Sequence, residues 1–572
     1  MNKSDNKAIF LLYLFLIFPV VLVQAQETLT ERVYVHLDKE CYVAGEDIYM
    51  KFFTTGSDFK ASDLSKVGYI EIADTEKPQI QHIIALDKGR GSSKVSIPHH
   101  IPSGIYQLTG YTRYMRNEGE KSFFSRHIAI VNVTESSESD RVVLQPDNTE
   151  RFPIRELNSI QVKTDKGLYG NRSEVELSLS GIPSNVSDLV ISVSRNDSVT
   201  SIPGVDKNKW VEDVRAAHTS GIGSQFLPEY EGHIISGNVV PLNENSSLVN
   251  AGSFYTTLGF VGRDIHIYAG QVSPDNTVNY YTEEIYGPQE IVTGVNSYVK
   301  ELSYRIDITS PYHGKLPDNL PELLIDPDNE PLKKRLLDRS VAAQINRIMR
   351  IDSTGNPVPL TNYYNIEPHL SYDLDEYTRF NTMSETFIEY VRRIIVRRVD
   401  GERRLKVLKE DAKRYNAGNT LVLLDGVPIY DHEDIINYNP RLVKRIHIYS
   451  GSYLFGGRTF ECMVSFTTHR ANLPSIQLDE QSQLISYDCP ALYEPFPMPD
   501  YRLEKVRESR IPDLRHTIYW NPYAEEINHN VPVRFYTSDL SGHYRVIVEG
   551  ITDDGRMVYG STDFVVATSS PQ

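Results

Sequence analysis

Histidines and acidic residues that could bind a metal ion are present in this 572-residue chain, but their spacing does not suit coordination. His99 and His100 are adjacent, so on a strand they point to opposite faces and do not share one ion. His432 lies in the acidic segment 431–434. Carboxylates at that spacing favour the first turn of a helix, where they interact with the helix dipole. The sequence therefore predicts no metal site.

Nucleophile and phosphate-binding motifs do not appear either. The chain has no HExxH, no GxSxG and no Walker phosphate loop. The segment 221–224 reads Gly-Ile-Gly-Ser, but Gln225 follows it where a phosphate loop needs lysine. Three cysteines, Cys41, Cys462 and Cys489, are too few for a disulfide framework. Free buried thiols are favoured over a Cys462–Cys489 bridge, and no catalytic or cofactor site is predicted.

Arginines concentrate in one segment, where Arg397, Arg398, Arg403 and Arg404 lie within residues 392–404. The β-branched residues of this segment favour a strand, which follows an expected helix at 384–390. The basic run stands out because the formal net charge of the chain is −17. It is either a solvated face or a contact for an acidic partner, since opposite charges steer association.

A buried strand is predicted at Leu421–Leu424, where four consecutive apolar residues make sense only if both faces are covered. Leu423 lies within this run. Asp425 and Gly426 end it with a turn, and Pro428 limits the backbone after the turn.

Further elements follow in a fixed order: a short helix over Ile435 and Ile436, an alternating strand at 443–449 and a last strand at 462–468. Between these strands, Gly451, Gly456 and Gly457 supply permissive backbone. This order resembles the plug domain of TonB-dependent outer-membrane receptors. The resemblance implies a structural role for Leu423, Asp425, Gly426, Pro428, Gly451, Gly456 and Gly457.

In those receptors the plug sits inside a large β-barrel. A barrel of that size needs about twenty strands of roughly ten residues, and the residues after Leu473 are too few to form them. The sequence therefore predicts that this chain is not a transporter by itself.

The N-terminus reads as a secretory leader, predicted over 1–25 with cleavage before Gln26. Lys3 and Lys7 precede an apolar run at 9–23, which is shorter than the roughly twenty residues that a spanning helix requires. We expect an exported protein in the periplasm or peripheral at the outer membrane, with no integral membrane segment after cleavage. Its acidic charge disfavours nucleic acid as a partner.

The fold class predicted is mainly β, with tandem immunoglobulin-like or macroglobulin-like β-sandwiches and a small α+β domain. Alternating strands from Glu31 onward predict a first sandwich at 27–140. Its motif Asp38-Lys39-x-x-Tyr42 recurs in part as Asp165-Lys166-x-x-Tyr169, which predicts a second sandwich at 150–228. The motif resembles the MG2 domain of α2-macroglobulin-like proteins. The thioester sequence Cys-Gly-Glu-Gln of some macroglobulins is missing, so covalent trapping through it is excluded.

The remaining units are predicted from strand and helix patterns. A third sandwich is expected at 229–310, and a helical lead-in and plug-like domain at 318–475, with a helix over 331–350. A proline-rich extended linker is expected at 490–500. The last four alternating strands predict a C-terminal sandwich-like unit at 501–567, whose core includes Trp520, Phe535, Tyr544 and Val548.

Together these features resemble a group of exported proteins from Bacteroidetes-type bacteria. The first function hypothesis is a non-catalytic scaffold that binds envelope proteins through sandwich edges or the plug-like domain. The second is an accessory of a TonB-dependent uptake system, with a receptor or its energising machinery as partner. A hydrolase without a recognisable motif is the third.

Overall fold

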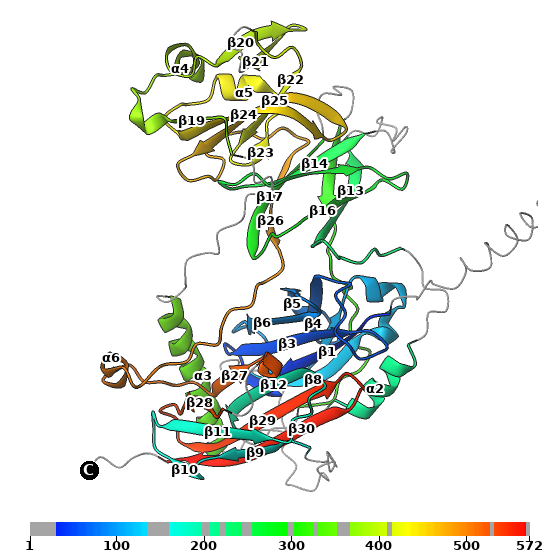
Figure 1. Ribbon diagram of the computed structural model, residues 1–572, viewed down its shortest axis with the longest axis vertical. Coiled ribbons are helices and arrows are strands. Elements are labelled where there is room, and N and C mark those ends of the chain that lie inside the picture. Colours follow the sequence, from blue (N-terminus) through cyan, green and yellow to red (C-terminus); the bar gives the residue numbers. More distant parts are fainter. Residues whose placement is uncertain are drawn as a thin grey trace, which may run out of the picture.

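The computed structural model describes residues 30–133, 159–196, 205–217, 225–242, 254–295, 303–323, 330–351, 367–408, 414–526 and 531–567. Strands dominate, and they form three two-layer sandwiches and one α+β unit (Figure 1). The predicted fold class is therefore confirmed. The predicted leader at 1–25 lies outside the described residues. Among the residues described, no helix is both long and apolar enough to cross a membrane.

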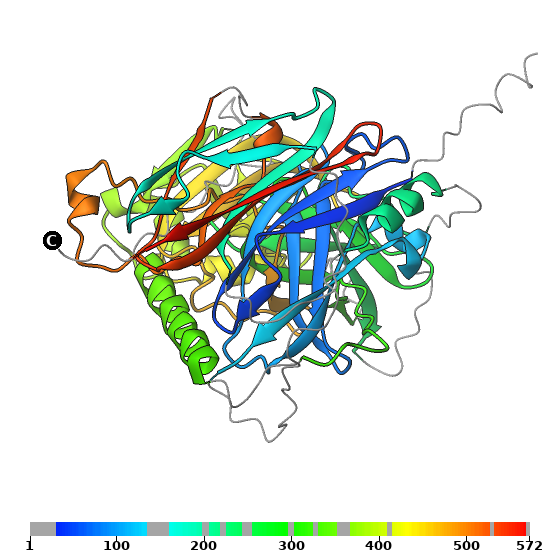
Figure 2. The same cartoon turned by 90° about the horizontal axis from the view of Figure 1, so that it is seen from below.

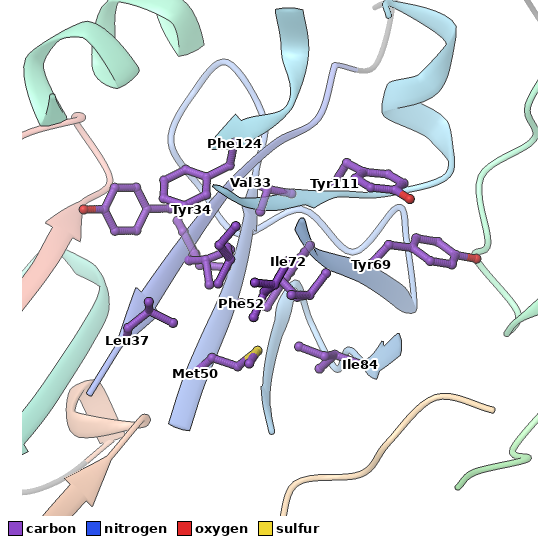
Figure 3. Close-up of a cluster of buried hydrophobic side chains, with 14 of the residues drawn as sticks. Val33, Tyr34, Leu37, Met50, Phe52, Tyr69, Ile72, Ile84, Tyr111 and Phe124 are labelled. Atoms are coloured by element: carbon purple, nitrogen blue, oxygen red, sulfur yellow. The ribbon is translucent and has the colours of Figure 1, made fainter. Parts of the chain in front are cut away.

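The first sandwich has a three-stranded and a five-stranded sheet. Its strands, in sheet order, are β1 (Arg32–Leu37), β3 (Asp47–Thr55) and β6 (Arg90–Ser96), then β2 (Cys41–Val43), β8 (Phe124–Val131), β7 (Gly104–Tyr111), β4 (Val67–Ala73) and β5 (Pro78–Ala85). Apolar side chains of both sheets meet between them, including Val33 and Phe52 from one and Ile72 and Ile84 from the other (Figure 3). All six residues of β1 are buried, so both faces of the smaller sheet are covered.

The second sandwich joins two distant parts of the chain. Its strands, in sheet order, are β9 (Gln161–Thr164), β11 (Glu174–Ser180) and β28 (Val533–Tyr536), then β10 (Leu168–Tyr169), β30 (Met557–Val566), β29 (Gly542–Thr552), β12 (Val186–Arg195) and β27 (Thr517–Asn521). The units predicted separately at 150–228 and 501–567 are therefore one domain. Phe535 and Tyr544 share its core with Val175. Alternation had identified the C-terminal strands and their buried side chains, but it carries no information about which strand each one pairs with.

The repeated motif makes the same tyrosine–aspartate contact in both copies. The Tyr42 hydroxyl donates to the Asp38 carboxylate at 2.8 Å, and the Tyr169 hydroxyl donates to Asp165 at 2.6 Å. The two sandwiches also share one strand order, β2-β8-β7-β4-β5 in the first and β10-β30-β29-β12-β27 in the second. The insertion between β12 and β27 thus replaces the turn between β4 and β5. Because neighbouring antiparallel strands hold the two ends of an insertion close together, the sandwich tolerates it.

The inserted segment contains the third sandwich. Its strands, in sheet order, are β16 (Thr277–Tyr281), β13 (Ile234–Pro241) and β18 (Tyr304–Ile308), then β15 (Ile267–Gln271), β14 (Tyr255–Phe260), β17 (Pro288–Val295) and β26 (Gln483–Asp488). The prediction of 229–310 missed β26, which follows the α+β unit in sequence and returns to pair with β17. For this α+β unit we keep the name of its prediction, the plug-like domain. The plug-like domain is therefore inserted into the third sandwich, and the third sandwich into the second.

The plug-like domain has a five-stranded sheet and a separate hairpin. The sheet order is β19 (Leu370–Asp373), β24 (Val443–Phe455), β25 (Arg458–Thr468), β22 (Asn419–Leu424) and β23 (Val427–Pro428). The hairpin is β20 (Ile394–Val399) and β21 (Glu402–Val407), and the helices are α4 (Met383–Glu389) and α5 (His432–Ile436). Thr382 and Glu385 form a capping box on α4. The Asp431 side chain accepts from the Glu433 N–H at the start of α5, so the acidic segment is a helix start, as predicted.

The helices α3 (Glu330–Ile351) and α2 (Lys207–Arg215) pack on the first sandwich. The helix predicted at 331–350 is α3, but it packs on the first sandwich and does not lead into the plug-like domain: Leu336 lies against Val43. The α2 helix places the Trp210 indole N–H 2.8 Å from the Val33 carbonyl.

The predicted linker has no regular secondary structure at 492–499. Ala491 at its start pairs with β5, and the short α6 (Glu504–Arg507) follows it.

A buried ion pair anchors α3, and its stability is expected to depend on pH. The Arg339 guanidinium lies 2.6 Å from the Glu46 carboxylate. Burial alone would raise the pKa of Glu46, but Arg339 and Lys39 lower it well below its ordinary value of 4.5. A carboxyl whose pKa is lower in the folded than in the unfolded state stabilises the fold at pH values above its unfolded-state pKa. This stabilisation is lost as the pH falls toward the folded-state pKa. Glu46→Gln should cost about 2 kcal/mol at neutral pH. That difference in the urea-derived free energy of unfolding should shrink on acidification below about pH 4.5; a constant difference would contradict the assignment.

Candidate interaction site

The strand Leu421–Leu424 is covered on both faces, but by two different parts of the chain. Leu421 and Leu423 face the third sandwich, where they contact Ile265 and Ile267. Val422 and Leu424 belong to the internal core of the plug-like domain, together with Phe387, Ile435 and Phe466. One face of the plug-like sheet therefore docks on this chain's own third sandwich, above which it lies in Figure 1.

Asp425 is a buried structural carboxylate at the end of this strand. It accepts hydrogen bonds from the Thr468 N–H at 2.7 Å, the Thr468 hydroxyl at 2.7 Å and the Leu473 N–H at 2.9 Å. Its own carbonyl accepts from the Gly262 N–H at 2.9 Å, which links the turn to the third sandwich. The predicted turn at Asp425-Gly426 is thus a connection between domains.

Glycine is required at position 426. Its φ is +81°, and a Cβ atom there would lie 2.6 Å from the Phe260 carbonyl oxygen. Pro428 ends the turn within β23.

The three later glycines belong to one long hairpin. Gly456 and Gly457, with φ of +58° and +69°, form the turn between β24 and β25. Gly451 lies where the register between these strands shifts, between Ser450 and Tyr453. The residues between the two predicted strands, 450–461, are therefore largely strand as well.

The hairpin β20–β21 carries the four predicted contact arginines, and we call it the arginine hairpin. In its register Arg397 lies opposite Arg404, and Arg398 opposite Arg403. Directly opposed like charges destabilise a strand pair. Two of the four side chains are held within the domain. Arg403 Nε lies 2.7 Å from the Glu433 carboxylate, and Arg404 contacts Glu402 and donates to the Tyr430 carbonyl at 2.6 Å.

Arg397 and Arg398 are exposed. The Arg397 guanidinium lies 5.2 Å from the centre of the Tyr415 ring. Within the described ranges, no carboxylate lies within ion-pair distance of either guanidinium. The hairpin thus presents two accessible positive charges on a strongly acidic chain.

Two basic side chains near the arginine hairpin, Lys406 and His432, are largely buried and fixed by backbone hydrogen bonds. Lys406 donates to the Ala417 and Gly418 carbonyls at 3.0 and 2.6 Å. Burial, with Arg404 and Lys406, lowers the pKa of His432 to about 3. Since His432 Nδ1 accepts from the Leu405 N–H at 2.9 Å, this histidine is neutral and structural.

The other candidates from the sequence remain apart. His99 and His100 are exposed in the first sandwich. In the part of the chain that the structure describes, no three His, Cys, Asp or Glu side chains are grouped to hold a metal ion. Among the described residues, Cys41, Cys462 and Cys489 form no disulfide bond; Cys462 lies in the plug-like core and Cys489 in the core of the third sandwich. The segment 221–224 lies outside the described residues.

Sequence reasoning missed a cleft of about 440 Å³ at the open edge of the third sandwich. Its apolar lining comes from Ile308 and Pro311 on one side and Ile485 and Tyr487 on the other. β18 and β26 are the edge strands of their sheets here. Alternating polar and apolar residues in Gln483–Asp488 could have predicted the strand β26. They could not have predicted the cleft, because it also requires β18 from another part of the chain.

The chain matches no family model and no curated protein. Among solved structures, it is similar to a Salmonella α2-macroglobulin mutant, with 9% identity and a TM-score of 0.15, over 94% of this chain and 23% of that one. It is also similar to Escherichia coli α2-macroglobulin activated by porcine elastase, with 9% identity and a TM-score of 0.23, over 94% of this chain and 44% of that one. The Escherichia coli adhesin FdeC matches 50% of this chain and 66% of its own, with 8% identity and a TM-score of 0.14. This chain thus spans less than half the length of the two macroglobulins, and these TM-scores assign it to no family.

Proposed function

We propose that this protein is a non-catalytic binding and scaffold protein of the cell envelope, in which the arginine hairpin contacts an acidic protein partner. One observation carries the proposal. The plug-like sheet is docked on the third sandwich through Leu421 and Leu423, while Arg397 and Arg398 are exposed on a hairpin outside that interface (Figure 1).

The chemistry of the hairpin favours carboxylate-rich segments. A guanidinium presents a planar fork of donors that matches a carboxylate. Arg403 already binds Glu433 in this way, with both of its forked nitrogens in contact with the carboxylate. Arg397 and Arg398 are available for the same type of contact with a second chain. The envelope location rests on the predicted leader at 1–25. More specifically, we propose that this partner is a receptor of a TonB-dependent uptake system or its energising machinery.

The double variant Arg397→Glu/Arg398→Glu is expected to fold normally and to lose partner binding several-fold, because each exposed ion pair contributes up to about 1 kcal/mol. The parent and variant chains would be used as bait in envelope extracts, with bound proteins quantified by mass spectrometry. Binding to a glutamate-rich and a lysine-rich peptide would be measured in parallel. The glutamate-rich peptide should bind the parent, more weakly as salt rises, and should bind the double variant less, whereas any binding of the lysine-rich peptide should not weaken in that variant.

The matched control is Lys60→Glu/Lys166→Glu, which makes the same charge change at two exposed sites on the first and second sandwiches. Reversal of Arg403 or Arg404 is unsuitable, because it would break their contacts with Glu433 and Tyr430. Reversal of all four arginines would therefore disturb folding as well as binding. Equal recovery by the folded double variant would reject the hairpin as the contact. Hydrolytic turnover by the purified chain would reject the non-catalytic assignment.

A further inference from the structure

A fully buried lysine lies between two carboxylates where the first and second sandwiches meet. Lys51 comes from β3, Asp188 from β12, and Glu525 from the short helix η5 (Ala524–Glu526). The Lys51 Nζ contacts Asp188 Oδ1 and lies 2.9 and 3.1 Å from the two Glu525 oxygens. The side chains of Lys51 and Asp188 are 0% exposed, and that of Glu525 is 7% exposed. Figures 1 and 2 both show these two sandwiches packed against each other.

The surroundings of this group exclude water. The Lys51 Nζ lies 5.1 Å from the centre of the Tyr523 ring. Val190 and Trp520 form an apolar cluster with Tyr49 at the same joint. The desolvation of two opposite charges in such a site is only partly offset by their attraction. A neutral covalent product would remove both charges.

Both carboxylates hold the Lys51 amine directly. The amine contacts Asp188 Oδ1, which is buried. The amine nitrogen therefore lies beside the Asp188 carboxyl group. Glu525 is fixed separately, because one of its oxygens accepts from the Leu189 N–H at 3.1 Å.

His36 holds the other oxygen of Asp188. Its Nε2 lies 2.6 Å from Asp188 Oδ2, and its Nδ1 lies 2.8 Å from the Glu549 carboxylate. Ionised carboxylates only accept hydrogen bonds, so both ring nitrogens donate and His36 is an imidazolium. Burial alone would lower the pKa of His36, but Asp188 and Glu549 raise it. The positive ring draws electrons from the Asp188 carboxyl carbon.

We propose that Lys51 and Asp188 condense to an intramolecular amide bond that joins the first and second sandwiches, with Glu525 carrying the protons. Glu525 takes one proton from the Lys51 ammonium, and the free amine attacks the Asp188 carboxyl carbon. Glu525 passes this proton to one Asp188 oxygen as the new C–N bond forms. The same oxygen then receives a second proton from the nitrogen, again through Glu525, and departs as water when its bond to the carbon breaks. The ammonium and carboxylate thus become an amide and one water molecule, and Glu525 returns to its starting state.

The ionisation of the two carboxyl groups defines the starting state. Burial raises the pKa of Glu525, so this carboxylate accepts a proton more readily than an exposed glutamate does. Burial alone would raise the pKa of Asp188 too, but Lys51 and His36 lower it to about 2. The starting state is therefore an ion pair, and the transfer of a proton to Glu525 begins the reaction.

Peptide mapping of the purified full chain by mass spectrometry tests the proposal. The expected result is a branched tryptic peptide that contains Lys51 and Asp188, lighter than its two parts by the mass of one water, with no cleavage after Lys51. Separate, unmodified peptides covering both residues in protein that had folded before digestion would overturn the proposal. Attachment of Lys51 to Glu525 would also overturn it.

Two variants test separately the role of Lys51 as the nucleophile and the role of Glu525 as the proton carrier. Lys51→Arg keeps the positive charge but should give no branched peptide, because a guanidinium is not a nucleophile at neutral pH. Glu525→Gln should also abolish it, and a full yield in this variant would overturn the role of Glu525. Lys207→Arg is the matched control, since Lys207 pairs with Glu549 at 3.0 Å in the same joint and should leave the branched peptide intact. Circular dichroism would establish that each variant has folded.

Discussion

Leu423→Asp is expected to unfold the plug-like domain and to release it from the third sandwich. Leu423 is 0% exposed and packs in the cluster that joins β22 to Ile265 and Ile267. The substitution removes a buried side chain and places a carboxylate without a partner in an apolar site. We expect a loss of more than about 5 kcal/mol in the free energy of unfolding of this domain. Differential scanning calorimetry should show the loss or a large downward shift of one transition.

Leu454→Asp is the control for this experiment. Leu454 belongs to β24 of the same domain but is 77% exposed, so the same change should alter stability by less than about 0.5 kcal/mol. If Leu423→Asp melts like the parent chain, the strand at Leu421–Leu424 is not buried between the two domains.

Asp425→Ala is expected to destabilise the plug-like domain by about 4 kcal/mol, because it leaves three hydrogen-bond donors buried without an acceptor, at about 1–3 kcal/mol each. These donors belong to Thr468 and Leu473. The backbone adds to the cost, because φ at Asp425 is +47°, a conformation that alanine adopts less readily than aspartate. Urea unfolding followed by the fluorescence of a probe attached within this domain would measure the change.

Asp431→Ala is the matched control within the domain. The Asp431 side chain caps α5 by accepting from the Glu433 N–H at 3.0 Å, so its loss should cost only about 1 kcal/mol. Asp425→Asn should fall between the two alanine variants, since the amide oxygen retains part of the acceptor capacity. Equal effects of the two alanine substitutions would contradict the structural role assigned to Asp425.

The nested order of the domains affects how the protein holds together. The second sandwich requires β9–β12 from one part of the chain and β27–β30 from another, with the whole third sandwich and plug-like domain between them. Its joint with the first sandwich contains Lys51, Asp188 and His36. An amide bond at that joint would keep the two sandwiches attached when either one opens.

Local features of the sequence predicted many elements correctly. Four consecutive apolar residues at Leu421–Leu424 indicated a strand covered on both faces, and the acidic residues after Asp431 indicated a helix start. The repeated Asp-Lys-x-x-Tyr motif indicated two related sandwiches, because the tyrosine and aspartate interact within five residues. Such signals are readable because their physical cause lies within one turn or one strand.

Local patterns in the sequence predicted many of the strands, the helix starts, the turns and the basic segment around Arg397. Three features became visible only in the folded chain: β27–β30 complete the second sandwich, Arg403 is bound to Glu433, and Lys51 meets Asp188. The physical reason is that an alternating pattern specifies which face of a strand is buried, whereas the backbone hydrogen bonds that join strands are the same for every partner. The choice among partner strands depends on how all side chains pack together. For Lys51 and Asp188, this packing brings together residues of two separate domains.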